Sequence, residues 1–213
     1  KVDMLSAFVM LIVTSIGAIV MVFAPKSVQL EIPSDRTYLF YTMYLLTFAG
    51  LLGITITADA FNLFVFLEIS SLSSYVLISL GAQRNALTAA LRYLILGTVG
   101  ATFYIIGVGL MYQMTGTLNI SDLAERMPDV ASTKTILIAV GFITIGIGLK
   151  LGLFPLHVWL PNAYAYAPSV VTAFLAATAT KVAVYALLRV YFSIFGINLF
   201  SALPIAEVLL ILG

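Results

Sequence analysis

The sequence contains no cysteine, a single histidine and few charged residues, which make up 9% of its 213 positions. Without cysteine the chain can form no disulfide and can hold neither zinc nor an iron–sulfur cluster through thiolates. One histidine cannot build a metal site without other ligands. The sequence therefore predicts a protein that holds no cofactor and no metal ion of its own.

The shortage of charge is matched by an excess of apolar residues. Hydrophobic residues make up 62% of the chain, and the mean hydropathy is +1.13. A soluble domain carries about a quarter charged residues, so this chain could not cover its surface with polar groups in water. The composition predicts a membrane protein. The net charge is only +1 and the basic residues do not cluster, so nucleic acid is not an expected partner.

Apolar runs separated by short polar segments predict an all-α, polytopic bundle of transmembrane helices. A span needs roughly 20 residues. The predicted spans are about 4–24, 38–57, 61–80, 87–114, a broken 134–163, 168–191 and an incomplete 204–213. We expect residues 1–213 to form one transmembrane domain within a longer polypeptide. Between the fourth and fifth spans, residues 121–127 are predicted to form a surface helix capped by Ser121.

The segment 134–167 is too long for one straight crossing and too short for two crossings with a loop. Several glycines and then Pro155 and Pro161 interrupt it. Proline removes a helical hydrogen bond, and the freed carbonyl is tolerated at membrane depth only where protein or water covers it. The pattern predicts a broken helix with Lys150 beside the break. Trp159, just after the break, is typical of an aromatic residue at the membrane interface.

Three charged residues fall deep inside predicted spans: Glu68, Lys150 and Lys181. On insertion scales each costs roughly 2.5–3.5 kcal/mol at a helix centre. Such residues persist where they are paired, hydrated or used. The structural alternatives stay open: the glutamate and the second lysine could serve only to hold helices together, and Lys150 could extend to the interface along its aliphatic stem.

Helical spacing predicts polar neighbours for these charges. Ser71 and Tyr75 share a helix face with the glutamate, and Thr178 and Tyr185 share a face with the second lysine. The only histidine, His157, lies between two prolines. An imidazole titrates near neutral pH and suits proton transfer, but a lone histidine is as often a structural hydrogen-bonding residue.

The chemistry of a buried acid and amine predicts a proton relay. Burial disfavours the ammonium form of lysine, and a neighbouring carboxylate favours it. A change in the charge or position of Glu68 would therefore make Lys150 release or take up a proton. We expect these two residues to meet across helices, with Lys181 as the next proton carrier.

Three stretches resemble a known family of membrane proteins. They are "FNLFVFLEISSLSSYVLI", "TGTLNISDLA" and "GLKLGLFPLHVWLPNAYAYAPSVVTAFLAATATKVAVYALLR". They resemble the antiporter-like proton-pumping subunits of respiratory complex I, of Mrp-type multisubunit sodium/proton antiporters and of membrane-bound hydrogenases. The resemblance spans nearly the whole chain and is strongest to the D-type member of the Mrp antiporters.

The resemblance implies a fourteen-helix antiporter-like fold with two inverted five-helix repeats, of which this chain would cover about the third to ninth helices. It implies that Glu68 is the glutamate of the fifth helix, Lys150 its partner on the broken seventh helix, and Lys181 the lysine of the eighth. His157 matches the histidine of the family's Pro-Leu-His motif. Where many relatives have Asp-Ala-His, this chain has Asn162-Ala163-Tyr164, so a titratable pair is missing there.

The expected function is that of a proton-translocating subunit of a multisubunit cation/proton antiporter in the cell membrane of a prokaryote. Its expected partners are other membrane subunits, the lipid bilayer and H⁺. Passage of Na⁺ stays open as an alternative, through Glu68 and the serines at 70, 71, 73 and 74. Two further alternatives are a proton-pumping subunit of a complex I-type NADH-quinone oxidoreductase or membrane-bound hydrogenase, and a structural anchor without transport.

Overall fold

A computed structural model describes residues 2–196 of the chain. The long helices are α1 (Met4–Glu31), α2 (Thr37–Ile56), α3 (Ala60–Ser79), α4 (Arg84–Thr115), α6 (Lys134–Leu151) and α8 (Ser169–Leu188). Shorter elements are the 3₁₀ turn Ser34–Arg36, α5 (Ile120–Val130), α7 (Leu160–Tyr166) and a π-helical turn Arg189–Phe195. The predicted all-α bundle is confirmed. The predicted incomplete span 204–213 lies outside the described residues.

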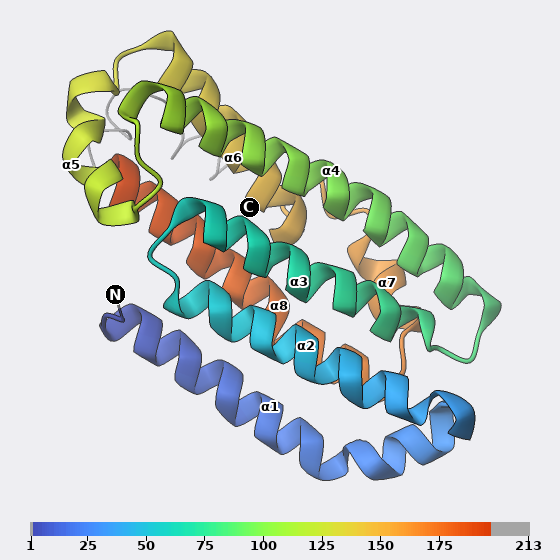
Figure 1. Cartoon of the computed structure of the whole chain (residues 1–213). Helices are drawn as coiled ribbons and strands as arrows, with labels where there is room; N and C mark the ends of the chain where they lie inside the picture. Colours follow the sequence, from blue (N-terminus) through green and yellow to red (C-terminus); the bar gives the residue numbers. More distant parts are fainter. Residues whose placement is uncertain (1, 197–213) are drawn as a thin grey trace.

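The long helices form two layers (Figure 1). Helices α1, α2, α3 and α4 lie side by side in one layer, each in contact with the next. Behind them α6 packs against α4, and α8 packs against α1, α2 and α6. The short helix α5 lies across one end of the bundle (Figure 1).

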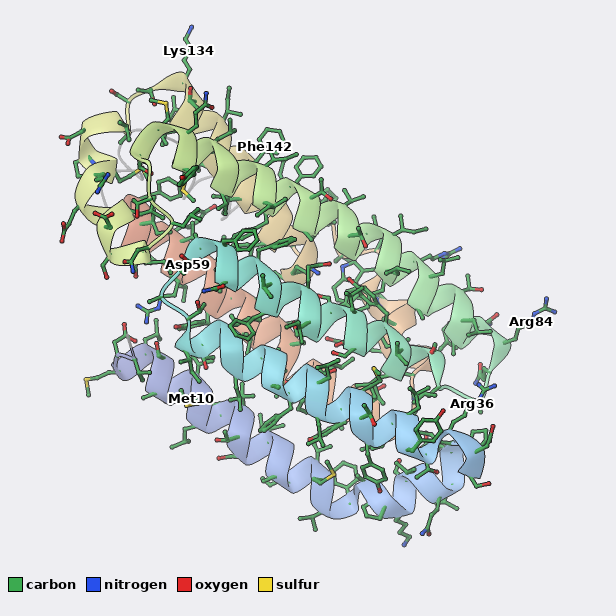
Figure 2. The ribbon with its side chains drawn as sticks, in the orientation of Figure 1. Met10, Arg36, Asp59, Arg84, Lys134 and Phe142 are labelled. Atoms are coloured by element: carbon green, nitrogen blue, oxygen red, sulfur yellow. The ribbon has the colours of Figure 1, made fainter. Side chains whose placement is uncertain are left out.

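Six helices in the described part are long and apolar enough to cross a membrane. Polar residues gather at the two ends of the bundle. In Figure 2, Arg36 and Arg84 lie toward one end, and Asp59 and Lys134 toward the other. At 1.5 Å per residue the 32 residues of α4 extend about 48 Å, compared with about 30 Å of hydrocarbon in a bilayer. This helix therefore reaches beyond the hydrocarbon region.

Helix α1 is longer than the sequence predicted. We expected it to end at residue 24, before Pro25, but it continues to Glu31 and bends in its last third (Figure 1). Proline removes one helical hydrogen bond, which a bend accommodates. The extension places the Glu31 carboxylate at the start of α8, where it accepts a 2.7 Å hydrogen bond from the Ser169 amide. An anion stabilises a helix N-terminus, so the added turns link α1 to α8.

The surface helix α5 begins one residue earlier than predicted, and its cap is a different residue. The side chain of Asn119, not Ser121, accepts hydrogen bonds from the amides of residues 121 and 122. Asn119 also lies opposite Asp59 in an antiparallel bridge. The flanking bonds, from the Ala60 amide to the Leu118 carbonyl and from the Ile120 amide to the Ala58 carbonyl, join the α4–α5 connection to the α2–α3 connection. The cap therefore sits where two connections at the same end of the bundle meet.

The helix break falls where the sequence placed it, directly after Lys150. Helix α6 ends at Leu151 and is capped by Gly152, whose φ of 76° is a conformation that favours glycine. Trp159, predicted as an interface aromatic, lies in the following turn and is only 3% exposed, so its ring packs within the protein. Its ring stacks on Tyr93 at 3.9 Å between centroids, and its indole N–H donates to the Leu149 carbonyl at 2.9 Å. The indole thus supplies a hydrogen bond to the last turn of α6.

Helices α4 and α6 touch through their backbones near Gly146. A Cβ atom on Gly146 would lie 2.7 Å from both the Gly100 carbonyl oxygen and the Tyr104 amide nitrogen. Only glycine permits this approach, because a methyl group there would push the two helices apart. The close approach fixes the height and rotation of α6 one turn before Lys150.

A polar cluster ties the start of α1 to the end of α8. The Arg189 guanidinium contacts the Asp3 carboxylate and the Ser6 hydroxyl, each at 2.6 Å. It also donates to the Tyr185 hydroxyl at 2.8 Å, and that hydroxyl in turn donates to the Thr55 carbonyl of α2. The Ser6 amide and the Arg189 charge together lower the pKa of Asp3. The cluster therefore joins three helices at one end of the bundle.

Replacing Gly146 with alanine is expected to destabilise the protein by about 1–3 kcal/mol, because the methyl group overpacks the α4–α6 contact. Thermal unfolding of the purified protein measures the effect. Gly141→Ala is the matched control: it lies on the same helix, and no atom lies within 4 Å of its added Cβ. Equal melting temperatures for the two variants would contradict the packing explanation.

The Asp3 cluster is expected to weaken in acid. Because the pKa of Asp3 is lowered from 3.8 in the folded protein, its carboxylate contributes stability above that pH. This contribution is lost as the pH falls below 3.8 toward the folded-state pKa. The melting temperature of the wild type should exceed that of Asp3→Asn near neutral pH and approach it in acid. A constant difference across this range, or an equal pH dependence in the exposed control Asp129→Asn, would speak against the cluster.

Candidate functional site

Glu68 of α3 and Lys150 of α6 form a largely buried ion pair. The Lys150 ammonium lies 3.0 Å from a Glu68 carboxylate oxygen and donates a second hydrogen bond of 2.5 Å to the Ser71 hydroxyl. The Lys150 side chain is 5% exposed and the Glu68 side chain 19%. Lys150 therefore does not extend to the interface, and the two charges meet across helices.

The local sequence explains how each partner is positioned. Glu68 and Ser71 are three residues apart on α3, so both side chains leave the same face. The Ser71 hydroxyl donates to the Leu67 carbonyl at 2.7 Å, which leaves its lone pairs free to accept from Lys150. On α6, Lys150 lies one turn after Gly146 and in the last turn of the helix. Carbonyl dipoles at a helix C-terminus favour a positive charge.

A small cavity lies against Lys150, the basic member of the ion pair. It measures about 20 Å³, and a cavity of roughly 10–15 Å³ is enough for one water molecule. Its polar wall includes Lys150, Ser70, Ser71 and Ser74, and its far side is formed by Ala179, Val182 and Ala183 of α8. A lysine ammonium has three donors, and two are used by Glu68 and Ser71. The cavity gives the third donor room for a water on the side of α8.

Aromatic rings close the site on the side of the helix break. Tyr75 of α3 contacts Tyr93 of α4 edge-to-face at 4.5 Å between centroids, and Tyr93 stacks on Trp159. Tyr75, predicted as a polar neighbour of Glu68, is buried, and its hydroxyl has no hydrogen-bond partner among the described residues. Neither Tyr93 nor Trp159 was predicted as part of the site. Stacking between residues so distant in sequence leaves no local signal.

Lys181 of α8 does not contact the ion pair. Its side chain lies on the exposed face of α8, where its ammonium donates to the Ala176 carbonyl at 2.6 Å and to the Thr180 hydroxyl at 3.3 Å. The prediction that Thr178 and Tyr185 accompany Lys181 was wrong. Both are buried, Thr178 donates to the Phe174 carbonyl, and Tyr185 belongs to the Arg189 cluster. Lys181 is therefore exposed on α8, whereas Thr178 is buried.

His157 lies in the turn between α6 and α7, apart from the ion pair. Its ring is 5.6 Å from the Phe154 ring, centroid to centroid. Its Nδ1 atom is buried and has no hydrogen-bond partner within residues 2–196. This position beside the helix break is the one predicted, but no contact joins the imidazole to Glu68 or Lys150.

The serines of α3 do not form an oxygen cluster around Glu68. The hydroxyls of Ser70, Ser73 and Ser74 donate to carbonyls of their own helix. Ser71 is occupied by the Lys150 ammonium. Across the described part of the chain, no group of three or more His, Cys, Asp or Glu side chains is placed to hold a metal ion.

Comparison with known proteins gives the same family throughout. Residues 57–213 match the family model "NADH:quinone oxidoreductase/Mrp antiporter, TM". The chain is 45% identical over 212 residues to the N subunit of the NADH-quinone oxidoreductase of Desulforudis audaxviator, covering 100% of this chain and 41% of that protein. It is 34% identical over 195 residues to the D-type subunit of the Na(+)/H(+) antiporter of Alkalihalophilus pseudofirmus, covering 91% and 39% of the two chains.

The fold agrees with these sequence matches. A chain of the membrane-bound sulfane sulfur reductase, an archaeal respiratory membrane complex, superposes with a TM-score of 0.88 at 30% identity. The match covers 97% of this chain and 41% of that one, so the chain spans about two fifths of the length of its relatives. The predicted ranking, strongest to the D-type Mrp member, is not supported, since the identity to the N subunit is higher. The family resemblance identified in the sequence is confirmed: the chain is a multi-pass membrane protein that belongs to the NADH:quinone oxidoreductase/Mrp antiporter transmembrane family.

Proposed function

We propose that the chain forms the proton-translocating part of an antiporter-like membrane subunit and that the Glu68–Lys150 pair is its proton-exchanging element. The observation that carries the proposal is the 3.0 Å contact between these two groups deep in the bundle. Placing a charge at the centre of a membrane helix costs roughly 2.5–3.5 kcal/mol. Apolar side chains could make a purely structural contact between the helices without this free-energy cost.

The carboxylate controls the proton on the amine. While Glu68 is charged and near, it stabilises the ammonium form of Lys150. When Glu68 is protonated or moves away, burial destabilises the ammonium, and its proton passes to water in the adjoining cavity. Proton uptake reverses these steps. The pair therefore couples a small change in carboxylate position or charge to proton transfer.

Lys181 is the next proton carrier in this proposal. The far wall of the cavity is formed by Ala179, Val182 and Ala183, which flank Lys181 along α8. Water passing between these small side chains would connect the two lysines. An outward-facing charge halfway along a transmembrane helix also requires a protein cover, because lipid would leave it unsolvated. We propose that this cover comes from the remaining length of the subunit or from a neighbouring membrane subunit.

We propose a multisubunit cation/proton antiporter in the cell membrane of a prokaryote as the complex, with H⁺ as the ion moved by this pair. The match to the D-type subunit of a bacterial antiporter supports it. The second candidate is the proton-pumping arm of a complex I-type quinone oxidoreductase, which the 45% identity to an NADH-quinone oxidoreductase subunit favours. In both complexes the pair would perform the same step.

Neutralising either member of the pair is expected to abolish proton transport. Lys150→Ala and Glu68→Gln should each lower proton flux in inverted membrane vesicles by at least about a hundredfold, since a positioned proton-transfer group contributes on the order of 10²–10⁴. The controls are Lys134→Ala, at the start of the same helix, and Glu125→Gln, exposed on α5. Wild-type flux in the first two variants, with the complex assembled, would refute the proposal.

The double variant separates transport from structure. Glu68→Gln alone leaves an unpaired buried ammonium and should destabilise the protein by about 3–5 kcal/mol, whereas Glu68→Gln with Lys150→Met should restore most of that stability. Transport should stay absent in the double variant. Recovery of both stability and transport would show that the pair is only a structural contact and would refute its role in proton exchange. Thermal unfolding and vesicle flux measure stability and transport separately.

A further inference from the structure

A second polar site, which includes neither member of the ion pair, lies between α4 and α7. A pocket of about 270 Å³ is formed by α4 and α7, and its polar wall consists of Asn85, Thr88, Arg92, Asn162 and Tyr166. No Asp or Glu of the described part lines it. None of these five side chains makes a hydrogen bond or ion pair within residues 2–196. One guanidinium and four uncharged polar groups thus converge without partners of their own.

An apolar groove continues from this pocket along α4. It has a volume of about 130 Å³ and is lined by Ile95, Leu96, Val158, Trp159 and the stem of Arg92. Arg92 therefore belongs to both hollows, with the polar one on the side of the helix start and the apolar one on the side of the bilayer. Ile95 is 55% exposed and Val158 65% exposed, so the groove faces the surroundings of the bundle.

The depth of Arg92 matches the level of lipid headgroups. It lies eight residues into α4, which is about 12 Å from the start of a helix of about 48 Å. The hydrocarbon region spans only about 30 Å, so this helix extends beyond it by roughly 9 Å at each end if it is centred. The guanidinium is then at the boundary between headgroups and hydrocarbon, with the groove on the hydrocarbon side.

We propose that these two hollows together bind one anionic phospholipid. The lipid phosphate would accept hydrogen bonds from the planar Arg92 fork and from the amide and hydroxyl groups around it. An acyl chain would occupy the groove of Ile95, Leu96 and Val158. Basic pockets between transmembrane helices are suited to lipid headgroups, and the absence of a carboxylate in the lining removes repulsion of the phosphate. A soluble phosphate would use only the polar half of the site.

The site has a structural link to the helix break. Trp159 lines the groove, stacks on Tyr93 and bonds the last turn of α6. A bound acyl chain would therefore contact Trp159, and through it the stacked ring of Tyr93 beside Lys150. Lipid occupancy is expected to stabilise the turn between α6 and α7, and this holds whether or not the pair transports protons.

Native mass spectrometry of the subunit in its purified complex, titrated with phosphatidylglycerol, tests the proposal. Arg92→Gln should weaken the tightest lipid-binding step by at least about tenfold, through loss of the charge-assisted bonds. Arg84→Gln is the matched control, because Arg84 is exposed on the same helix and lines neither hollow. Unchanged affinity in the Arg92 variant, or an equal loss in the Arg84 variant, would overturn the proposal.

Two further measurements distinguish a lipid phosphate from a soluble phosphate. Val158→Ser should also weaken phosphatidylglycerol binding, whereas Val22→Ser, which changes an 84% exposed valine on the distant helix α1, should not. Inorganic phosphate at millimolar concentration should fail to displace the lipid. Displacement by inorganic phosphate, or insensitivity to Val158→Ser, would reject a lipid in favour of a soluble anion. The melting temperature in lipid-free detergent should be the same for all four variants, which excludes misfolding as the cause.

Discussion

The structure depends on one buried contact between an amine and a carboxylate. Lys150 and Glu68 come from different helices, and each would be strongly unfavourable in the bilayer without the other. The Ser71 hydroxyl satisfies a second donor of the ammonium, and the small cavity gives the third donor room for water. The Ser71 hydroxyl and the cavity thus offset part of the solvation that the two charges lose on burial.

The helix break contributes to this balance. Because α6 ends at Leu151, Lys150 sits in a last turn whose carbonyls favour a cation. The Trp159 indole bonds one of these carbonyls, and its ring joins the aromatic wall of Tyr75 and Tyr93. A continuous helix would have used those carbonyls internally. The break therefore places polar backbone groups beside the Lys150 charge. At this depth, water alone could not solvate that charge.

The two faces of α8 differ in their surroundings. Its inner face packs against the core and forms the far wall of the cavity, while Lys181 lies on its exposed face. At one end, the Arg189 cluster fixes α8 to α1 and α2, and at the other, Glu31 bonds its first amide. Helix α8 is therefore fixed at both ends, with the cavity wall on its inner face and Lys181 on its outer face.

The sequence by itself determined which segments cross the membrane and which charges lie at depth. The runs at 38–57, 61–80 and 87–114 match α2, α3 and α4 to within three residues, because a long apolar run can only be satisfied in lipid as a helix. It also indicated that Glu68 and Lys150 pair, since an isolated charge in lipid is so unfavourable.

Only the tertiary structure decided how each helix is rotated and what its faces meet. The outward position of Lys181, the burial of Trp159 and the assignment of Tyr185 to the Arg189 cluster could not be predicted from spacing. The extension of α1 through Pro25 likewise depends on a contact with distant Ser169. Helices that are apolar on every face carry no amphipathic signal, so their orientation is set by close contacts such as that at Gly146.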